Sequence, residues 1–171
     1  MSEKLKDLLI KDSLRRWEEN YKRIEKCVSL LNEDQVWKTP GPQMNSIGNL
    51  ILHLSGNIKQ YILSGLGRSA DTRQRWLEFE AGSRIEVEGL MKGHKNVIKE
   101  ASEVLKNQSG RDLSSTYKVQ GFDLDGVSIV IHVTEHYSYH TGQIALLTKA
   151  MTGHDLGFYA GMDLNVRNRE E

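Results

Sequence analysis

The chain has only two prolines, and both fall in one short loop. Pro40 and Pro42 stand two residues apart in the segment Lys38-Thr39-Pro40-Gly41-Pro42. Proline interrupts helices because it lacks a backbone donor and its ring clashes with the preceding turn. The remainder of this 171-residue chain is therefore free to form long uninterrupted helices.

Four segments have the apolar periodicity of amphipathic helices. They cover residues 3–31, 47–63, 85–106 and 126–151, and in each of them apolar side chains recur every three or four positions. Asn45 or Ser46 can cap the second helix, and Asp125 and Gly153 bound the last one. Four long helices joined by loops predict an all-α fold, a four-helix bundle. A parallel sheet is not expected, since strands and helices do not alternate.

Three further segments complete a single predicted domain of residues 1–171. Residues 116–124 alternate in polarity and contain a glycine, which predicts a short β-hairpin before the last helix. Residues 68–82 form a polar arm, extended or with a short helical turn, whose arginines we expect to be solvent-exposed and ion-paired. The tail, residues 154–171, is expected to fold back on the bundle or on a partner chain through Leu156, Phe158 and Tyr159, and to fray from Asp163 onward.

The charge balance excludes some classes of partner. Lys and Arg number 23, and so do Asp and Glu, so the formal net charge is zero. A basic excess is needed to bind nucleic acids or anionic membranes, so neither is expected as a partner. No apolar run approaches 18 residues and no signal-peptide pattern opens the chain, so we expect a cytoplasmic protein. The single cysteine, Cys27, excludes an intrachain disulfide and is expected to be a small buried side chain.

Histidines cluster in the last predicted helix. His132, His136 and His140 are spaced by four residues, and each such step advances about 40° around an α-helix. The three side chains therefore lie within an arc of about 80°. His136, His140 and Gln143 also follow a track where an apolar residue is expected. We assign the core face of this helix to Ile129, Val133, Ile144 and Leu147.

A divalent metal ion explains this pattern better than core packing does. A buried imidazole needs partners for its nitrogens, and one isolated histidine commonly finds them in polar neighbours. Three in register on an apolar face favour a metal, because two histidines at i and i+4 form a helix-borne chelate. A further ligand must come from a facing helix, and His53 and His94 are the candidates. Periodicity slightly favours His94 as a buried group but does not decide which one reaches the metal.

The same helix matches a second motif. His132, Glu135 and His136 fit the inverted zinc-protease pattern H-x-x-E-H, with Glu135 as general base. That chemistry needs a further acidic ligand downstream on a larger scaffold, whereas only 35 residues follow His136 and His140 is left unexplained. We therefore interpret Glu135 as a solvent-exposed carboxylate or as one that supports a ligand.

Residues 45–54 and 136–144 carry a resemblance to a known family. The pair His136 and His140, followed by Thr-Gly-Gln-Ile, is similar to the signature of the DinB-like superfamily (DNA-damage-inducible, YfiT-like) of four-helix-bundle metalloproteins. The segment 45–54 resembles that family's histidine motif in the second helix. This resemblance implies a metal site made of His53, His136 and His140, with His94 and His132 outside it.

The resemblance also implies a reaction class. Three histidines leave a fourth position for water or substrate, which is the layout of a catalytic zinc site. Relatives include thiol S-transferases and a thiol-dependent isomerase, which implies a metal-dependent transferase that acts on a small-molecule substrate with a low-molecular-weight thiol. Zinc or nickel is the expected metal, with iron or manganese as further possibilities. A metal-dependent hydrolase, a non-catalytic metal-binding stress-response protein and a metal-free interaction bundle are the alternatives.

No residue is identified as the catalytic acid or base. Gln143, Asn57 and Tyr139 are candidates to orient a ligand or line the pocket. Gly142 is expected to let a neighbouring helix approach closely. The family, the apolar helix flanks and the aromatic tail together predict a homodimer.

Overall fold

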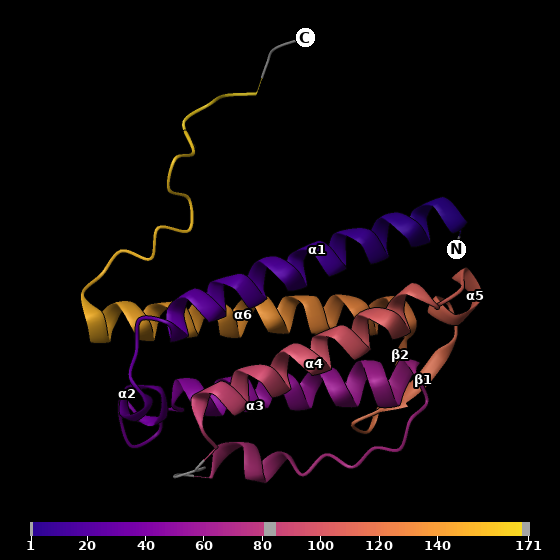
Figure 1. The fold of residues 1–171 in the computed structure, drawn as a ribbon. Helices are drawn as coiled ribbons and strands as arrows, with labels where there is room; N and C mark the ends of the chain where they lie inside the picture. The colour runs from indigo at the N-terminus through magenta and orange to yellow at the C-terminus, as the bar shows by residue number, and fades with distance from the viewer. Residues whose placement is uncertain (1, 81–84, 169–171) are drawn as a thin grey trace.

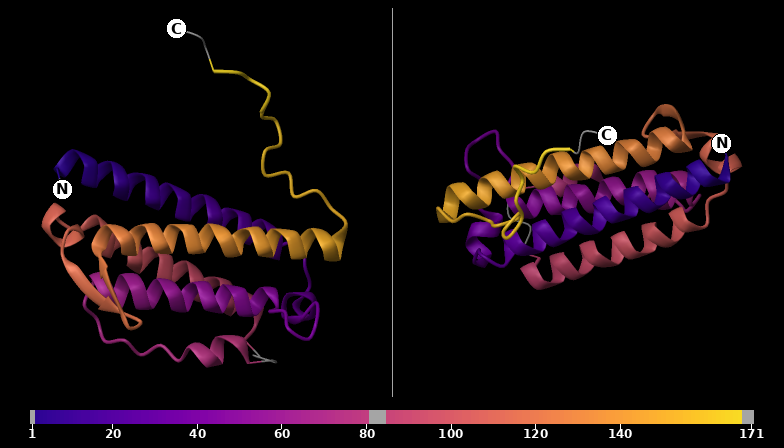
Figure 2. Two further views of the ribbon diagram at one scale, coloured as in Figure 1. Left: turned by 180° about the vertical axis from the view of Figure 1, so that it is seen from behind. Right: turned by 90° about the horizontal axis from the view of Figure 1, so that it is seen from above.

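Four long helices dominate the computed structural model, which describes residues 2–80 and 85–168. They are α1 (Glu3–Val28), α3 (Ile47–Ile58), α4 (Val87–Lys106) and α6 (Gly126–Thr152). Helix α1 packs against α6 and α3 against α4, and α3 also contacts α6 (Figures 1 and 2). The predicted all-α bundle is therefore confirmed.

The arm between α3 and α4 brings the chain back along the outside of the bundle. Helices α3 and α4 run in the same direction, opposite to α1 and α6 (Figure 1). Parallel consecutive helices need a connection as long as the helix itself. The arm makes this connection alongside α3 and contains one short 3₁₀ helix, η2 (Arg75–Phe79). The sequence predicted an arm over residues 68–82, of which 81 and 82 lie outside the described residues.

Capping side chains set the helix ends near the predicted positions. At the start of α3, the Ser46 hydroxyl oxygen accepts a hydrogen bond from the Asn49 N–H at 3.1 Å. At the start of α6, the Asp125 carboxylate accepts from the Ser128 N–H at 2.7 Å. Gly153 ends α6 in the left-handed conformation, with φ 70°.

The first predicted helix, residues 3–31, is too long by three residues, because α1 ends at Val28. A separate short helix, α2 (Glu33–Trp37), follows it. Asn32 and Gln35 explain the break, since each side chain accepts a hydrogen bond from the other's backbone N–H, at 2.9 Å in both cases. This reciprocal capping box starts a new helix with its own direction.

The second predicted helix, residues 47–63, continues beyond α3 with a wider turn. Residues Lys59–Leu66 form a π-helix, η1, and the Gly67 N–H donates to the Ile62 carbonyl oxygen at 2.8 Å. The third helix, α4, begins at Val87 rather than at residue 85.

The predicted hairpin is confirmed. Strand β1 (Thr116–Val119) pairs antiparallel with β2 (Phe122–Asp125) directly before α6. Gln120 and Gly121 join the strands with φ values of 52° and 85°. Positive φ at both central residues is the mark of a type I′ turn, which matches the twist of a two-stranded hairpin. A one-turn helix, α5 (Gly110–Leu113), precedes the hairpin.

The core of the bundle is apolar, with a few internal hydrogen bonds. Trp17 is fully buried, and its Nε1–H donates to the Thr134 hydroxyl at 3.0 Å, which joins α1 to α6. Cys27 is buried as expected, and burial raises the pKa of its thiol, so it behaves as a small apolar side chain. The predicted core position Leu147 is only partly buried, whereas Thr141 faces the core and donates its hydroxyl hydrogen to the Tyr137 carbonyl oxygen.

The tail folds back only over its first residues. Leu156 is buried and Phe158 packs against the core, as predicted. Tyr159 is exposed, although its hydroxyl accepts a hydrogen bond from Arg23 at 3.2 Å. Beyond it the chain leaves the bundle (Figure 1), and residues 169–171 lie outside the described residues. No helix in the described part of the chain is long and apolar enough to cross a membrane.

Gly126, the first residue of α6, lies against the backbone of α5. A Cβ atom at this position would lie 2.7 Å from the Cα of Leu113 and 3.1 Å from the Asp112 carbonyl oxygen. We expect Gly126→Ala to lower the free energy of unfolding by about 1–3 kcal/mol, because backbone atoms cannot move aside easily. Thermal unfolding should then shift down by about 3–10 °C.

Gly93→Ala is the matched control for this substitution. Gly93 lies inside α4, and, apart from the adjoining residues and the backbone of its own helix, no atom in the described ranges falls within 4 Å of a Cβ built there. Helix propensity alone should keep or raise stability, by up to about 1 kcal/mol. Equal melting temperatures for the two variants would contradict the close packing of α5 on α6.

Candidate metal centre

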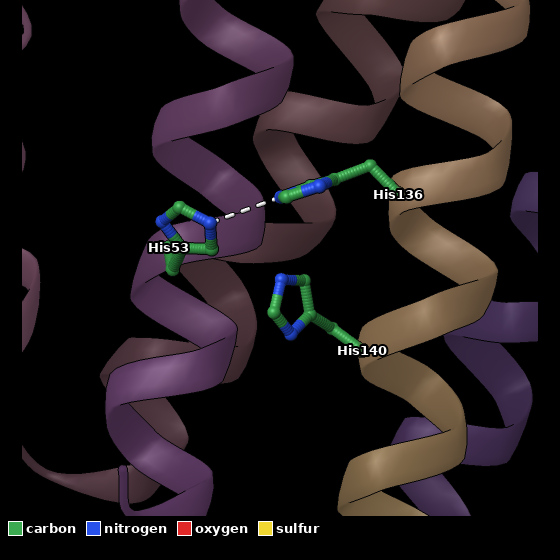
Figure 3. Close-up of side chains that lie close together, drawn as sticks. All are labelled: His53, His136 and His140. Carbon is green, nitrogen blue, oxygen red and sulfur yellow. Dashed lines mark hydrogen bonds between the residues drawn. The ribbon is translucent and has the colours of Figure 1, made fainter. Parts of the chain in front are cut away.

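Three histidine side chains converge between α3 and α6. His53 comes from α3, while His136 and His140 lie one turn apart on α6, and all three point into the space between the helices (Figure 3). One ring nitrogen from each lies within 4.8 Å of the other two. The closest approach is 2.9 Å, between Nε2 of His53 and Nε2 of His136. The structure thus brings together the three residues that the family resemblance implied.

The spacing of these nitrogens fits a shared divalent ion. Three nitrogens that each bind a tetrahedral zinc ion at about 2.0–2.1 Å lie about 3.4 Å from one another. The observed nitrogens, all within 4.8 Å of one another, lie close to this spacing. Within the described ranges, no fourth histidine, cysteine or carboxylate belongs to the cluster. A bound ion would therefore keep at least one position for a non-protein ligand.

Burial keeps the two α6 histidines in the form that binds metal. Burial, reinforced by the neighbouring histidines and Arg73, lowers the pKa of His136 to about 3. Burial also lowers the pKa of His140, although a hydrogen bond to Gln143 opposes the change. Both imidazoles are therefore neutral at pH 7, and a neutral imidazole is the species that coordinates a metal.

The arm contacts His53 on the side of the ring that faces away from the other two histidines. Its Nδ1 lies 2.8 Å from Oε2 of Glu78, which belongs to η2. The ring of Phe79 lies against the imidazole, with the ring centroids 4.9 Å apart. Two adjacent residues of the arm thus contact the same histidine.

Arg73 in turn holds the carboxylate of Glu78. Its Nε donates to Oε1 at 2.7 Å and its Nη2 to Oε2 at 2.8 Å, which is a two-point contact. Burial alone would raise the pKa of the Glu78 carboxyl, but the hydrogen bonds from Arg73 and His53, together with the charge of Arg73, outweigh burial and lower it. The expectation of a solvent-exposed arm is wrong for Arg73, because its side chain is only 4% exposed.

Two of the proposed supporting residues contact His140. The Nδ1–H of His140 donates to Oε1 of Gln143 at 2.7 Å, so Gln143 is placed to orient this imidazole. Tyr139 is 61% exposed, and its ring lies edge-on to His140 with a centroid distance of 4.9 Å. With Nδ1 of His140 engaged, Nε2 is the nitrogen left for a metal.

The third supporting residue, Asn57, contacts a histidine outside the cluster. Asn57 is buried, and its Nδ2 donates to Nε2 of His132 at 3.3 Å. The Tyr61 ring stacks on His132, with the ring centroids 4.3 Å apart. Protein groups therefore contact Nε2 and the ring face of His132, which also stacks on His136 from one turn away.

His94 is not a ligand but the centre of a buried hydrogen-bond chain. Its Nε2 accepts from the Tyr137 hydroxyl, and its Nδ1–H donates to the Ser55 hydroxyl oxygen, both at 2.8 Å. The Ser55 hydroxyl in turn donates a hydrogen bond to the Ile51 carbonyl oxygen at 2.9 Å. Each polar hydrogen in this chain has an acceptor, which explains how a polar ring can lie at the core position that periodicity indicated.

The structure agrees with the sequence analysis in setting the inverted zinc-protease pattern aside, and it corrects the expectation for Gly142. Glu135 is exposed and lies outside the histidine cluster, so the H-x-x-E-H pattern does not form a metal site here. Gly142 does not admit a close helix, since a Cβ atom built on it would meet no described atom within 4 Å. Conversely, sequence analysis missed Glu78 and Arg73 as parts of the site, because a charged loop gives no periodic signal of burial.

Similar solved structures identify the class of fold. A DinB-like protein from Bacillus cereus matches with a TM-score of 0.65 at 18% identity, over 81% of this chain and 90% of that one. A DinB-like protein from Bacillus subtilis matches with a TM-score of 0.64 at 14% identity, over 86% of this chain and 94% of that one. A conserved protein from Enterococcus faecalis matches with a TM-score of 0.73 at 13% identity, over 84% of this chain and 97% of that one. The chain therefore has the DinB-like fold, as the sequence resemblance implied.

The family itself is defined by a direct match to its model. Residues 6–160 match the family described as "Protein of unknown function (DUF1572)", and the chain belongs to this family. No curated protein matches the chain.

The burial of His94 predicts a pH-dependent stability. Burial lowers the pKa of His94 to about 4 in the folded protein, below its ordinary value of 6.5. As the pH falls, the unfolded chain therefore takes up this proton before the folded protein does. The contribution of His94 to the free energy of unfolding is complete above pH 6.5 and is lost as the pH falls toward 4. Between pH 7 and pH 5 the loss from this group is about 2 kcal/mol.

Urea unfolding of metal-free protein at pH 7 and pH 5 measures this loss. His94→Gln removes the titrating group and should reduce the pH-dependent drop by about 2 kcal/mol, even though the variant is less stable at pH 7. His154→Gln, at an exposed position in the tail, should leave the drop unchanged. The same drop in all three proteins would contradict a neutral buried His94.

Proposed function

We propose that this protein binds a divalent metal ion through His53, His136 and His140 and uses it to transfer a low-molecular-weight thiol to an electrophile. The observation that carries the proposal is the convergence of three ligand nitrogens, with no fourth protein ligand among the described residues. Sites with three protein ligands and one exchangeable position are typical of catalysis, whereas structural zinc sites are closed by four protein ligands.

The side chains around the cluster support binding from the solvent side. His136 and His140 are partly buried rather than enclosed, and the exposed Tyr139 ring lies beside His140. A divalent ion in this centre lowers the pKa of a coordinated thiol or water and so provides a nucleophile at neutral pH. Gln143 and Glu78 hold two of the imidazoles in fixed orientations, so the ligands need little rearrangement.

The donor set favours zinc or nickel over manganese. All three donors are imidazole nitrogens, which suit zinc, nickel, copper and iron, whereas manganese favours carboxylate and water oxygens. Tetrahedral zinc sites with three histidines and one open position are common in hydrolytic and transfer enzymes. We therefore propose zinc first and nickel second.

Elemental analysis of the freshly purified protein tests metal binding. We expect about one zinc or nickel ion per chain in the wild type and loss of at least about nine-tenths of it in His136→Ala/His140→Ala, since one ligand cannot hold the ion. His154→Ala is the control and should keep its metal. At a free metal concentration 100 times Kd, binding should add about 2.7 kcal/mol of stability to the wild type alone. Equal metal contents in all three proteins would refute the site.

The transfer reaction is tested with a panel of small thiols and an alkyl halide. In this reaction the sulfur–carbon bond forms as the carbon–halogen bond breaks, and the thiol proton and a halide ion are released. We expect the metal-loaded wild type to exceed the uncatalysed rate at least about tenfold with one thiol, equivalent to 1.4 kcal/mol of barrier. Product formation is followed by mass spectrometry, with His136→Ala as the inactive control.

The result of this panel separates the remaining alternatives. Turnover of activated esters or amides without a thiol would replace transferase with hydrolase, because the same centre can activate water. A metal-loaded protein with neither activity would be a non-catalytic metal-binding protein.

A further inference from the structure

The contact between His53 and Glu78 locates a proton. Nδ1 of His53 lies 2.8 Å from a carboxylate oxygen of Glu78, and both atoms carry lone pairs. Such a distance is attractive only with a hydrogen between the two atoms. The Glu78 carboxylate accepts two hydrogen bonds from Arg73, which favours its ionised form. Nη2 of Arg73 also lies 3.2 Å from Nδ1 of His53, but it already donates to Oε2 of Glu78 at 2.8 Å, whereas the carboxylate can only accept. The hydrogen between the imidazole and the carboxylate therefore belongs to Nδ1 of His53.

This assignment decides which atom of His53 can bind metal. In a neutral imidazole only one nitrogen carries a hydrogen, so Nε2 keeps its lone pair. Nε2 is also the atom that lies 2.9 Å from Nε2 of His136, inside the cluster (Figure 3). The opposite tautomer would direct an N–H at the position of the metal.

The arm fixes the carboxylate in place by contacts with α3, which carries Asn49, and with η1, which carries Gln60. Gln60 accepts a hydrogen bond from Nη1 of Arg73 at 2.8 Å and donates one to Asp71 at 2.8 Å. At the other end of the arm, Nδ2 of Asn49 donates to the Glu78 carbonyl oxygen at 2.9 Å. Glu78 thus cannot shift without breaking contacts on both sides of it.

A glycine on α3 makes the space for this ion pair. A Cβ atom at Gly56 would lie 1.9 Å from Oε1 of Glu78 and 3.0 Å from Nε of Arg73. Any other residue at position 56 would push the carboxylate out of its place beside His53. The chain accepts a helix-destabilising glycine where the ion pair touches the helix.

We propose that Glu78, clamped by Arg73 over Gly56, is a positioning residue that fixes Nε2 of His53 as the metal-binding atom. The role in metal binding rests on the proposed function, whereas the choice of tautomer does not need a metal. Glu78 acts through His53, since its carboxylate lies on the far side of the ring from the cluster.

The tautomer is measured by nitrogen NMR of histidine-labelled, metal-free protein at pH 7.5, with His53 assigned from a His53→Gln variant. The wild type should show a protonated Nδ1 and an unprotonated Nε2 at His53, with the hydrogen between the two facing Nε2 atoms carried by His136. In Glu78→Gln the single amide oxygen is taken by Arg73, so the NH₂ group faces Nδ1 and the proton should move to Nε2. Glu80→Gln, a neighbouring exposed position, is the control and should match the wild type. A protonated Nε2 in the wild type would overturn the proposal.

Zinc affinity, measured by competition with a chelator, tests the consequence. Both Glu78→Gln and Gly56→Ala should weaken zinc binding by about 10–100-fold, the usual effect of losing a hydrogen-bond partner of a ligand. Gly56→Ala leaves every charged group in the chain and only displaces the pair, so it also covers the case in which Glu78→Gln fails to fold. Gly93→Ala and Glu80→Gln are the matched controls. Wild-type affinity in a folded Gly56→Ala would overturn the proposal.

The two measurements distinguish a failure of the proposed function from a failure of the positioning role. If the wild type binds no metal, the proposed function is wrong, and the NMR result still decides whether Glu78 sets the tautomer of His53. If metal binds and both variants of the pair keep wild-type affinity, the metal centre stands and the positioning role falls.

Discussion

The need to give each buried imidazole nitrogen a partner governs the interior of this bundle. A polar ring in an apolar seam costs free energy unless its nitrogens form hydrogen bonds. Protein groups meet this need at His94 through Tyr137 and Ser55. At His53 and His140, groups from outside the histidine cluster engage only one nitrogen of each ring, through Glu78 and Gln143. The nitrogens left over face one another and His136, and a shared cation would satisfy all of them at once.

The topology of the bundle makes this arrangement possible. Because α3 and α4 are parallel, the connecting arm must travel the length of α3 (Figure 1). On its way it contacts His53 through Glu78. A short connection between antiparallel helices would leave that face to solvent. The crossover therefore supplies a buried carboxylate to a helix whose own sequence, Ile47–Ile58, contains none.

Local signals in the sequence predicted the fold well. Proline scarcity and apolar periodicity gave four helices, and single capping residues such as Ser46 and Asp125 placed their starts. The site was predictable only in part. The i, i+4 spacing placed His136 and His140 on one face of a helix, but the choice between His53 and His94 came from a family resemblance. That choice depends on whether a protein partner reaches each ring, and the hydroxyl of Tyr137 and the carboxylate of Glu78 come from distant parts of the chain. No local periodicity reports such long-range contacts.

The buried Arg73–Glu78 pair is better explained by its neighbour than by stability. Removing two charges from water costs several kcal/mol per ion, and replacing a buried pair with apolar side chains is often neutral or stabilising by about 1–4 kcal/mol. The pair also requires glycine at position 56, which costs about 1 kcal/mol of helix propensity relative to alanine. A structural role alone would favour an apolar contact between the arm and α3. What only an ionised carboxylate provides at this position is a strong acceptor for the Nδ1–H of His53, and that acceptor directs the other nitrogen of the ring toward His136 and His140.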